Sequence, residues 1–275
     1  MKTDLLLIPM GASFAQMRAA AVAAEATGFD GLWTWDHLRS TDGQGPCPEA
    51  WTLLSALAAV VPRMAIGPLV LNVINRHPAI LANMAATLQE VSDGRLILGI
   101  GAGGNRRMAY GAEQLMIGNE VGSDARRAER VVEAIQVMRR LWAGEAADFH
   151  GRHYQLRRPV GFVRPSVPPP IVVGAFGPKM ADVAGRHGDG LNTQAGHPQL
   201  SHLIDIARRA REASGRDPAG LLITVFAGLG EGWMRRGSKN RAAMEALGVD
   251  RLILLVEPPF EVDTIHEAGR MLSAS

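Results

Sequence analysis

The chain alternates short apolar runs with longer, mostly helical segments, and this alternation repeats eight times. The apolar runs have the length of strands and few polar positions, as in a parallel sheet that is covered on both faces. A doubly wound open sheet is the competing architecture, but eight such units predict an α/β fold of the (β/α)8 TIM-barrel type. The expected strands are residues 5–9, 31–36, 64–72, 96–102, 171–175, 191–194, 221–229 and 251–256.

Two segments interrupt this rhythm. Residues 103–122 are rich in glycine and are expected to be irregular. Residues 144–170 are expected to form an excursion between strands four and five, with a hairpin at 149–154 and then a proline-rich approach. The connections are too short for a second domain, so residues 1–275 are expected to form a single domain.

The composition narrows the class of protein. Hydrophobic residues make up 47% and charged residues 20%, which is ordinary for a soluble globular chain. Lys and Arg number 29 against 27 Asp and Glu, so a nucleic-acid partner is not expected. The single cysteine, Cys47, cannot form an internal disulfide, which favours the cytoplasm. No apolar run has the length of a signal peptide core or a membrane span, so no membrane partner is expected.

An acid and an imidazole follow the second expected strand. In a (β/α)8 barrel the active site lies at the carboxyl ends of the strands, where Asp36 and His37 are expected. The carboxylate is able to hold the ring and fix its tautomer, which would make His37 an acid or base near neutral pH. In the alternative interpretation, Asp36 caps the next loop and His37 is an ordinary surface residue.

The fourth expected strand runs into the glycine-rich segment 99–104. It superficially resembles a dinucleotide fingerprint, but no helix is expected directly after it and no acidic residue ends a strand about twenty positions on. Without a Cβ at Gly101, Gly103 and Gly104, a flat ring has room to lie against the backbone. The alternative is that these glycines only allow a turn.

A candidate phosphate site follows the fifth expected strand. Gly177 and Pro178 begin a helix there, which exposes backbone N–H groups at the positive end of the helix dipole, and Lys179 adds a cation. Proline at a helix start is also common for structural reasons alone.

Other enzyme classes find little support. The first strand carries no His-x-His pair, and neither His77 nor His197 has a second potential ligand at helical spacing, so no metal is expected. The chain also lacks a Gly-x-Ser-x-Gly elbow and a Walker motif, which argues against acyl transfer and nucleotide hydrolysis.

Taken together, several motifs resemble the luciferase-like monooxygenase superfamily, and within it the oxidoreductases that use the deazaflavin coenzyme F420. The similarity covers nearly the whole chain. It is carried by segments 24–33 with Asp36-His37-Leu38, 76–78 with 88–95, 98–103, 141–144 with 149–154, and 169–178 with 188–190.

The resemblance implies a coenzyme site at the mouth of a barrel. Asp36 would contact the deazaflavin ring and His37 the reacting centre, and a non-prolyl cis peptide would fall at about Leu69-Val70. Some relatives carry a glutamate where this chain has Gly104 and Asn105. The implied coenzyme-binding residues are Asp36, Leu69, Val70, Asn72, Ala102, Gly103, Ala175, Phe176, Gly177, Pro178 and Lys179, with phosphate contacts at the amides of Phe176 and Gly177.

The expected function is therefore hydride transfer between F420 and a small organic substrate, with His37 as proton donor or acceptor. Two alternatives are an FMN-dependent monooxygenase and a coenzyme-binding protein without turnover. The resemblance further implies a homodimer. The substrate is not specified, because the loops at 39–48, 103–122 and 230–237 that would form its pocket are irregular, with Trp233 and Met234 as candidate pocket residues.

Overall fold

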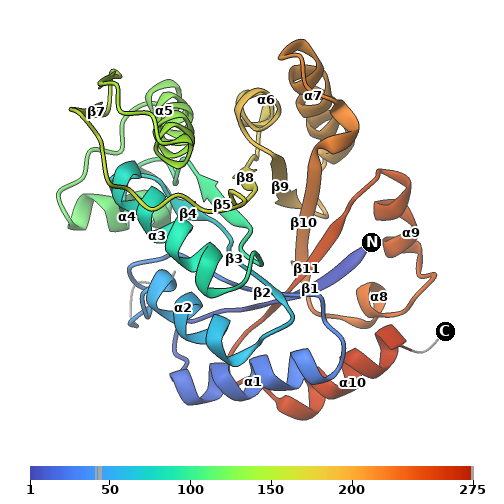
Figure 1. The fold of residues 1–275 in the computed structure, drawn as a ribbon. Coiled ribbons are helices and arrows are strands. Elements are labelled where there is room, and N and C mark those ends of the chain that lie inside the picture. Colours follow the sequence, from blue (N-terminus) through green and yellow to red (C-terminus); the bar gives the residue numbers. More distant parts are fainter. Residues whose placement is uncertain (41, 43–44, 274–275) are drawn as a thin grey trace.

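A computed structural model describes residues 1–40, 42 and 45–273 of the chain. Its main sheet is a barrel wall of parallel strands, with helices around the outside (Figure 1). The strands are β1 (Lys2–Leu7), β2 (Gly31–Thr34), β3 (Ala65–Pro68), β4 (Leu71–Asn72), β5 (Leu98–Gly101), β8 (Ile171–Gly174), β9 (Gly190–Gln194), β10 (Leu222–Gly228) and β11 (Arg251–Val256).

The barrel closes through one interrupted wall strand. The sheet order is β3-β2-β1-β11-β10-β9-β8-β5-β4, so the two outermost members, β3 and β4, are consecutive pieces of the chain. A parallel bridge between Ile66 and Leu96 adds a direct contact across the closure. The predicted (β/α)8 barrel is thus confirmed, but the third strand, expected to be continuous over 64–72, is broken at the cis peptide Leu69-Val70.

Eight helices follow the wall strands, counted over the described residues. Side chains of Ser13 and Ser123 cap the starts of α1 and α5. The first and last helices pack together (Figure 1). No helix in the described ranges has the length and apolar character needed to span a membrane. The helices are α1 (Phe14–Ala26), α2 (Ala50–Val60), α3 (Pro78–Val91), α5 (Asp124–Ala143), α6 (Pro178–His187), α7 (Leu200–Ala213), α9 (Lys239–Ala246) and α10 (Val262–Ser273).

Two short helices lie in segments that were expected to be irregular. They are α4 (Ala109–Met116) and α8 (Glu231–Met234), so the prediction for 103–122 was wrong in part. The start of α4 has no capping side chain at Met108, and Gly111 lies inside it, which removes the usual sequence signals of a helix. A single 3-10 turn, η1 (Pro218–Gly220), precedes β10.

The expected excursion between β5 and β8 is present. It contains an antiparallel hairpin formed by β6 (Phe149–His150) and β7 (Gln155–Leu156). The carboxylate of Glu133 on α5 accepts hydrogen bonds from the backbone N–H groups of Arg152, His153 and Tyr154, at 2.8, 2.8 and 3.1 Å. A helix side chain therefore anchors the hairpin turn to the barrel.

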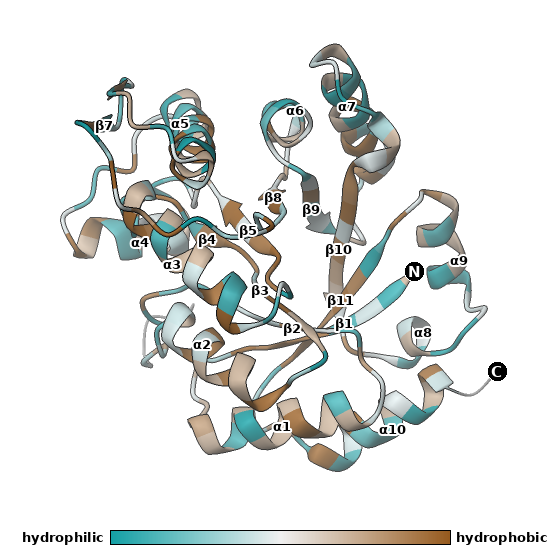
Figure 2. Cartoon of the chain, in the orientation of Figure 1, coloured by the Kyte–Doolittle hydropathy of each residue, from teal (hydrophilic) through white to brown (hydrophobic). Residues whose placement is uncertain are grey.

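The hydrophobic core has two layers. The larger one lies between strands and helices, where strand residues are mostly hydrophobic and helices carry polar residues as well (Figure 2). The smaller layer includes Leu6, Trp33, Val172 and Ile253. Side chains at alternate positions of a barrel strand point inward, so this layer fills the barrel interior. A filled barrel leaves its rim as the place for chemistry.

Candidate active site

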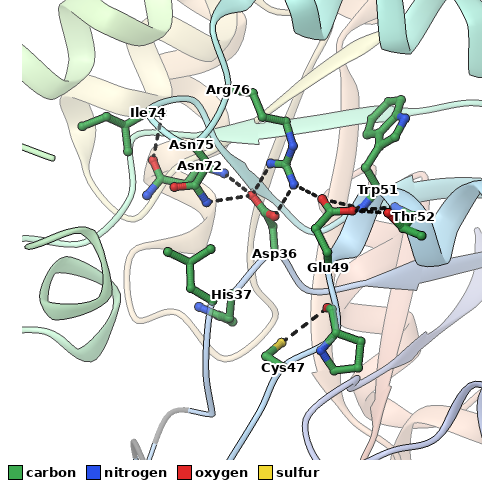
Figure 3. A network of polar contacts seen from close by, with 12 residues as sticks. Asp36, His37, Cys47, Glu49, Trp51, Thr52, Asn72, Ile74, Asn75 and Arg76 are labelled. Atoms are coloured by element: carbon green, nitrogen blue, oxygen red, sulfur yellow. Dashed lines mark hydrogen bonds and ion pairs between the residues drawn. The ribbon is translucent and has the colours of Figure 1, made fainter. Parts of the chain in front are cut away.

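Asp36 is the centre of a polar network just beyond β2. Its side chain is 2% exposed, and it accepts hydrogen bonds from both terminal nitrogens of Arg76 at 2.9 Å. The backbone N–H of Asn72 donates to the same carboxylate at 3.0 Å, and Asn75 Nδ2 lies 3.4 Å away (Figure 3). The predicted acid is therefore buried and satisfied by groups from the end of β4 and the loop that follows.

The expectation that Asp36 holds the ring of His37 was wrong. Among the described residues no hydrogen bond joins the two side chains, and none is drawn between them in Figure 3. Neighbouring side chains on an extended backbone point to opposite sides, so an acid and a base in succession do not face each other. The interpretation of Asp36 as a cap for the loop after it is likewise not the arrangement found, since its partners come from residues 72–76.

His37 instead contacts a glutamate from α4. Its Nδ1 lies 3.1 Å from Oε1 of Glu113, and the other carboxylate oxygen accepts from the backbone N–H of Leu38 at 2.9 Å. The His37 side chain is 15% exposed and that of Glu113 is 4% exposed. Glu113 was not predicted from the sequence, because it lies 76 residues from His37 in a segment that was expected to be irregular.

Two aromatic rings fix the plane of the His37 ring. Tyr110 stacks on it with ring centroids 4.7 Å apart, and Trp35 meets it edge-on at 5.7 Å. Tyr110 and Glu113 are three residues apart on α4, so they lie on one face of that helix. This short helix thus provides both a stacking partner and a hydrogen-bond acceptor for the candidate acid or base.

Arg76 also contacts Glu49, the residue that caps α2. Glu49 accepts from the backbone N–H groups of Trp51 at 3.1 Å and Thr52 at 2.7 Å. Burial of Glu49 acts to raise its pKa, but the hydrogen bonds from Thr52, Arg76 and Trp51 outweigh it and lower the pKa to about 2. Arg76 therefore joins the network at Asp36 to the start of a barrel helix. The role of Arg76 was not predicted, because from the sequence it is only part of the motif at 76–78.

The glycines of β5 make room for protein rather than for a ligand. A Cβ on Gly99 would lie 2.1 Å from the carbonyl oxygen of Pro68, and one on Gly101 would lie 2.7 Å from Cγ2 of Val70. A Cβ on Gly104 would meet Tyr110 at 2.9 Å. The interpretation that the missing side chains at Gly101, Gly103 and Gly104 leave room for a flat ring was wrong, because Val70, Asn72 and Tyr110 occupy the space where the three Cβ atoms would lie.

The remaining predicted residues of the third and fourth wall strands come together at the rim. Leu69 and Val70 are joined by the expected cis peptide, and Val70 is half-buried. Asn72 pairs with Gly101 in the sheet, and its amide lies against Gly103, whose φ is +67°. Ala102 is half-buried and Gly103 is exposed. Leu69 and Asn72 are themselves buried, so the partly open surface next to the Asp36 network is formed by Val70, Ala102 and Gly103.

Strand β8 ends at the same rim, and α6 begins shortly after it. Gly177 caps this helix without a side-chain acceptor, so the N–H groups of its first turn are left for another partner. Phe176 and Lys179 are exposed, and Pro178 is the first helical residue. Ala175 was predicted to contact the coenzyme, but it is fully buried. Its N–H donates to the backbone carbonyl oxygen of Asn192 at 2.8 Å.

A second cation borders this surface. Arg127 on α5 donates to the carbonyl oxygens of Ala102, at 3.5 Å, and of Gly103, and it forms an ion pair with Asp124 at 2.8 Å. Lys179 acts electrostatically on the same Asp124, which connects α5 with the start of α6. The rim between Gly103 and Gly177 therefore carries positive charge and free N–H groups, which suit an anionic group.

The two candidate pocket residues of the 230–237 loop differ in how deeply they are buried. Trp233 is half-buried against the main core, whereas Met234 is buried in it, so Met234 as a pocket residue was wrong. Both belong to the short helix α8.

Comparisons with known proteins agree with this architecture. A sequence model of the luciferase-like monooxygenase family matches residues 4–229. The F420-dependent hydroxymycolic acid dehydrogenase of Mycobacterium tuberculosis is 35% identical over 217 residues, which cover 78% of this chain and 59% of that protein. The F420-dependent glucose-6-phosphate dehydrogenase of Nakamurella multipartita is 34% identical over 203 residues, covering 71% and 58%. The chain thus spans somewhat more than half the length of these relatives.

Solved structures share the fold over nearly the whole chain. An F420-dependent secondary alcohol dehydrogenase in complex with an F420-acetone adduct superposes with a TM-score of 0.80 and 19% identity, covering 99% of both chains. The F420-dependent tetrahydromethanopterin reductase from Methanopyrus kandleri gives a TM-score of 0.79 and 17% identity, covering 99% of this chain and 98% of the other.

Proposed function

The chain belongs to the luciferase-like monooxygenase family, and from this premise we propose that it is an oxidoreductase that transfers a hydride between coenzyme F420 and a small organic substrate. The observation that carries the proposal is His37, a half-buried imidazole held at the barrel rim by Glu113 and stacked on Tyr110. The F420-dependent relatives named above support the choice of coenzyme.

The rim has suitable groups for such a coenzyme. Val70, Asn72, Ala102 and Gly103 would hold the ring system, and the first-turn amides of α6 with Lys179 would hold its anionic part. When bound, a deazaflavin supplies the hydride chemistry that protein side chains lack. The Asp36 carboxylate is already engaged by Arg76 and Asn72, so it would act mainly by fixing the backbone next to His37.

The chemical work of this chain's own residues is proton transfer and orientation. His37 would accept or donate the proton that accompanies hydride transfer at the substrate. The rings of Tyr110 and Trp35 hold the imidazole in place and shield two of its sides from water. Holding the substrate and the coenzyme ring in a fixed geometry lowers the barrier to hydride transfer, because the two are already oriented before they react.

Coenzyme titration tests the proposal. The purified protein is titrated with F420 and with FMN while fluorescence is followed, and hydride transfer is then measured with alcohol and carbonyl substrates, glucose-6-phosphate among them. We expect F420 to bind more tightly than FMN. His37→Ala is expected to keep F420 affinity but to lose roughly two orders of magnitude in hydride transfer. Binding of neither coenzyme, or unchanged turnover in H37A, overturns the proposal.

We further propose a homodimer formed through the groove between α2 and α3. The groove encloses about 500 Å³ and is lined mostly by apolar side chains, including Trp51, Met84 and Phe162. Ile80 and Val91 are 60% and 63% exposed at this groove, and such apolar surface is typical of protein interfaces. Light scattering should give a dimer for the wild type and a monomer for Ile80→Asp, and a wild-type monomer contradicts the proposal.

The arrangement of the chain is proposed to be one barrel domain in the cytoplasm. Pairing of β1 with β11 supports the single domain, since it joins the two ends of the barrel sequence in one sheet. Cys47 is a free thiol, which supports a reducing compartment.

A further inference from the structure

We infer that Glu113 is a positioning residue that fixes the neutral His37 ring in its Nδ1–H tautomer and so leaves Nε2 as the nitrogen that accepts a proton. The inference rests on the proposed function for its catalytic meaning, while the tautomer itself is a property of this chain alone. Three contacts of the described residues carry it.

The first contact is the backbone hydrogen bond. Leu38 N–H donates to Oε2 of Glu113 at 2.9 Å. A backbone N–H is always a donor, so this oxygen must act as an acceptor. The bond fixes the orientation of the carboxylate group, which is planar, and therefore fixes where its other oxygen points.

The second contact is to the ring. Oε1 of Glu113 lies 3.1 Å from Nδ1 of His37. An ionised carboxylate only accepts hydrogen bonds, whereas a neutral imidazole has one N–H and one lone pair. A lone pair on Nδ1 would face a second lone pair at this distance, so the proton lies on Nδ1 and the lone pair on Nε2.

The third contact prevents the ring from escaping this constraint. A half-turn of the imidazole about its Cβ–Cγ bond would put the ring carbon Cδ2 in the place of Nδ1 and so break the contact with Glu113, but Tyr110 is stacked on one face, with an angle of 26° between the rings. Trp35 meets the ring edge-on, at 87°. Tyr110 and Glu113 come from the same helix, so the stack and the hydrogen bond are held in one rigid unit.

A glutamine at position 113 reverses the pattern. Its amide presents one acceptor oxygen and one donor NH2 in the place of two acceptors. Leu38 N–H requires the oxygen, so the NH2 group turns toward Nδ1 of His37 and selects the opposite tautomer, with the proton on Nε2. Glu113→Gln thus keeps size and burial nearly unchanged while blocking the proton-accepting nitrogen.

The test measures the tautomer directly. Long-range ¹H–¹⁵N spectra of the histidine rings are recorded at rising pH until the ring signals stop changing, so that the neutral form is observed, with His37 assigned by its absence in H37A. We expect Nδ1–H in the wild type and Nε2–H in E113Q. The matched control is Glu120→Gln, whose exposed carboxylate contacts Arg126 and which should keep the wild-type pattern.

Kinetic measurements distinguish a failure of this inference from a failure of the proposed function. E113Q should bind F420 within about twofold of wild type and lose at least roughly tenfold in single-turnover hydride transfer, while E120Q loses nothing. The tautomer spectra need no coenzyme, so they decide the inference even if F420 does not bind. An Nε2–H signal in wild-type protein overturns it, as does an unchanged tautomer in E113Q. Poor folding of E113Q leaves the wild-type spectrum as the deciding result.

Discussion

The guanidinium of Arg76 forms two parallel hydrogen bonds to the carboxylate of Asp36, Nη1 to Oδ2 and Nη2 to Oδ1, both at 2.9 Å. The fork of an arginine matches a carboxylate in this way, and such charge-assisted pairs are the strong ones. Asn72 N–H donates to the same carboxylate, so the pair ties the end of β2 to the loop after β4. The backbone that carries His37 is therefore fixed through its neighbour.

Arg76→Met should be strongly destabilising. The Arg76 side chain is 14% exposed and that of Asp36 is 2% exposed, so the substitution leaves a buried carboxylate without its cation. Breaking a buried pair on one side costs about 3–5 kcal/mol. Urea denaturation should show this loss, and the double variant D36N/R76M should be less destabilised than R76M alone.

Arg126→Met is the control for this prediction. Arg126 pairs with Glu120 at 3.2 Å, and both side chains are largely exposed, so its loss should change stability by less than about 1 kcal/mol. Equal effects of R76M and R126M would show that the Asp36 network contributes little to the fold.

Glu49→Gln should lower stability near neutral pH but not in acid. Burial opposes ionisation of Glu49, but hydrogen bonds from Thr52, Arg76 and Trp51 lower its pKa from an ordinary 4.5 to about 2. A lowered pKa means stability that is present above about pH 4.5 and is lost as the pH falls toward 2. Since this side chain is 48% exposed, screening reduces the effect, and about 1 kcal/mol is expected from its capping role.

Urea titrations of wild type and E49Q at pH 7, 4.5 and 3 measure this pH dependence. The difference in unfolding free energy should be largest at pH 7 and should shrink at pH 3, where Glu49 in the unfolded chain is protonated. A difference that stays constant over this range would mean that the charge of Glu49 does not stabilise α2.

Features that depend on residues close together in the sequence could be predicted, and features that depend on residues far apart in the sequence could not. The (β/α)8 barrel and the position of Asp36 and His37 at its rim were predicted, because strand and helix patterns are local. The partners of these two residues were not, since Arg76 lies 40 residues from Asp36 and Glu113 lies 76 residues from His37. Such contacts depend on how the loops fold over the rim, which no local pattern encodes. The cis peptide at Leu69-Val70 was predicted from family resemblance alone.

Cys47 should react slowly with alkylating reagents at neutral pH. Burial is the main cause that raises the pKa of its thiol to about 11, and the charges of Glu113 and Asp36 add to it against a hydrogen bond from the backbone of His37. The thiolate is the reactive form, so labelling at pH 7 should be at least about tenfold slower than for an ordinary thiol. The rate should rise steadily up to pH 10.

Because Cys47 is the only cysteine, the labelling signal has a single source. Protein unfolded in urea serves as the control and should react at the ordinary rate. E113Q should label faster than wild type near pH 8, since one negative charge near the thiol is removed. Rapid labelling of the folded wild type at pH 7 would show that the thiol is not shielded.

Gly103→Ala should weaken coenzyme binding more than it weakens the fold. Gly103 has a φ of +67°, which costs other residues about 1–2 kcal/mol, and its Cβ would lie 2.6 Å from Nδ2 of Asn72. The side-chain amide of Asn72 must shift to make room, which disturbs the hydrogen bond that its Oδ1 accepts from the backbone N–H of Ile74 at 3.3 Å. Displacing both Asn72 and the backbone of Gly103 distorts the surface proposed for the ring, so F420 affinity should fall at least about tenfold.

Gly196→Ala is the matched control, because a Cβ there has no atom within 4 Å and its φ is not in the left-handed region. Fluorescence titration with F420 should give wild-type affinity for G196A and weaker binding for G103A, with both variants folded by circular dichroism. If G103A binds F420 as tightly as G196A does, the ring does not lie against Gly103 and Asn72. The coenzyme would then have to be held by the start of α6 alone, where the amides after Gly177 and the Lys179 cation suit its anionic part but offer no surface for a flat ring.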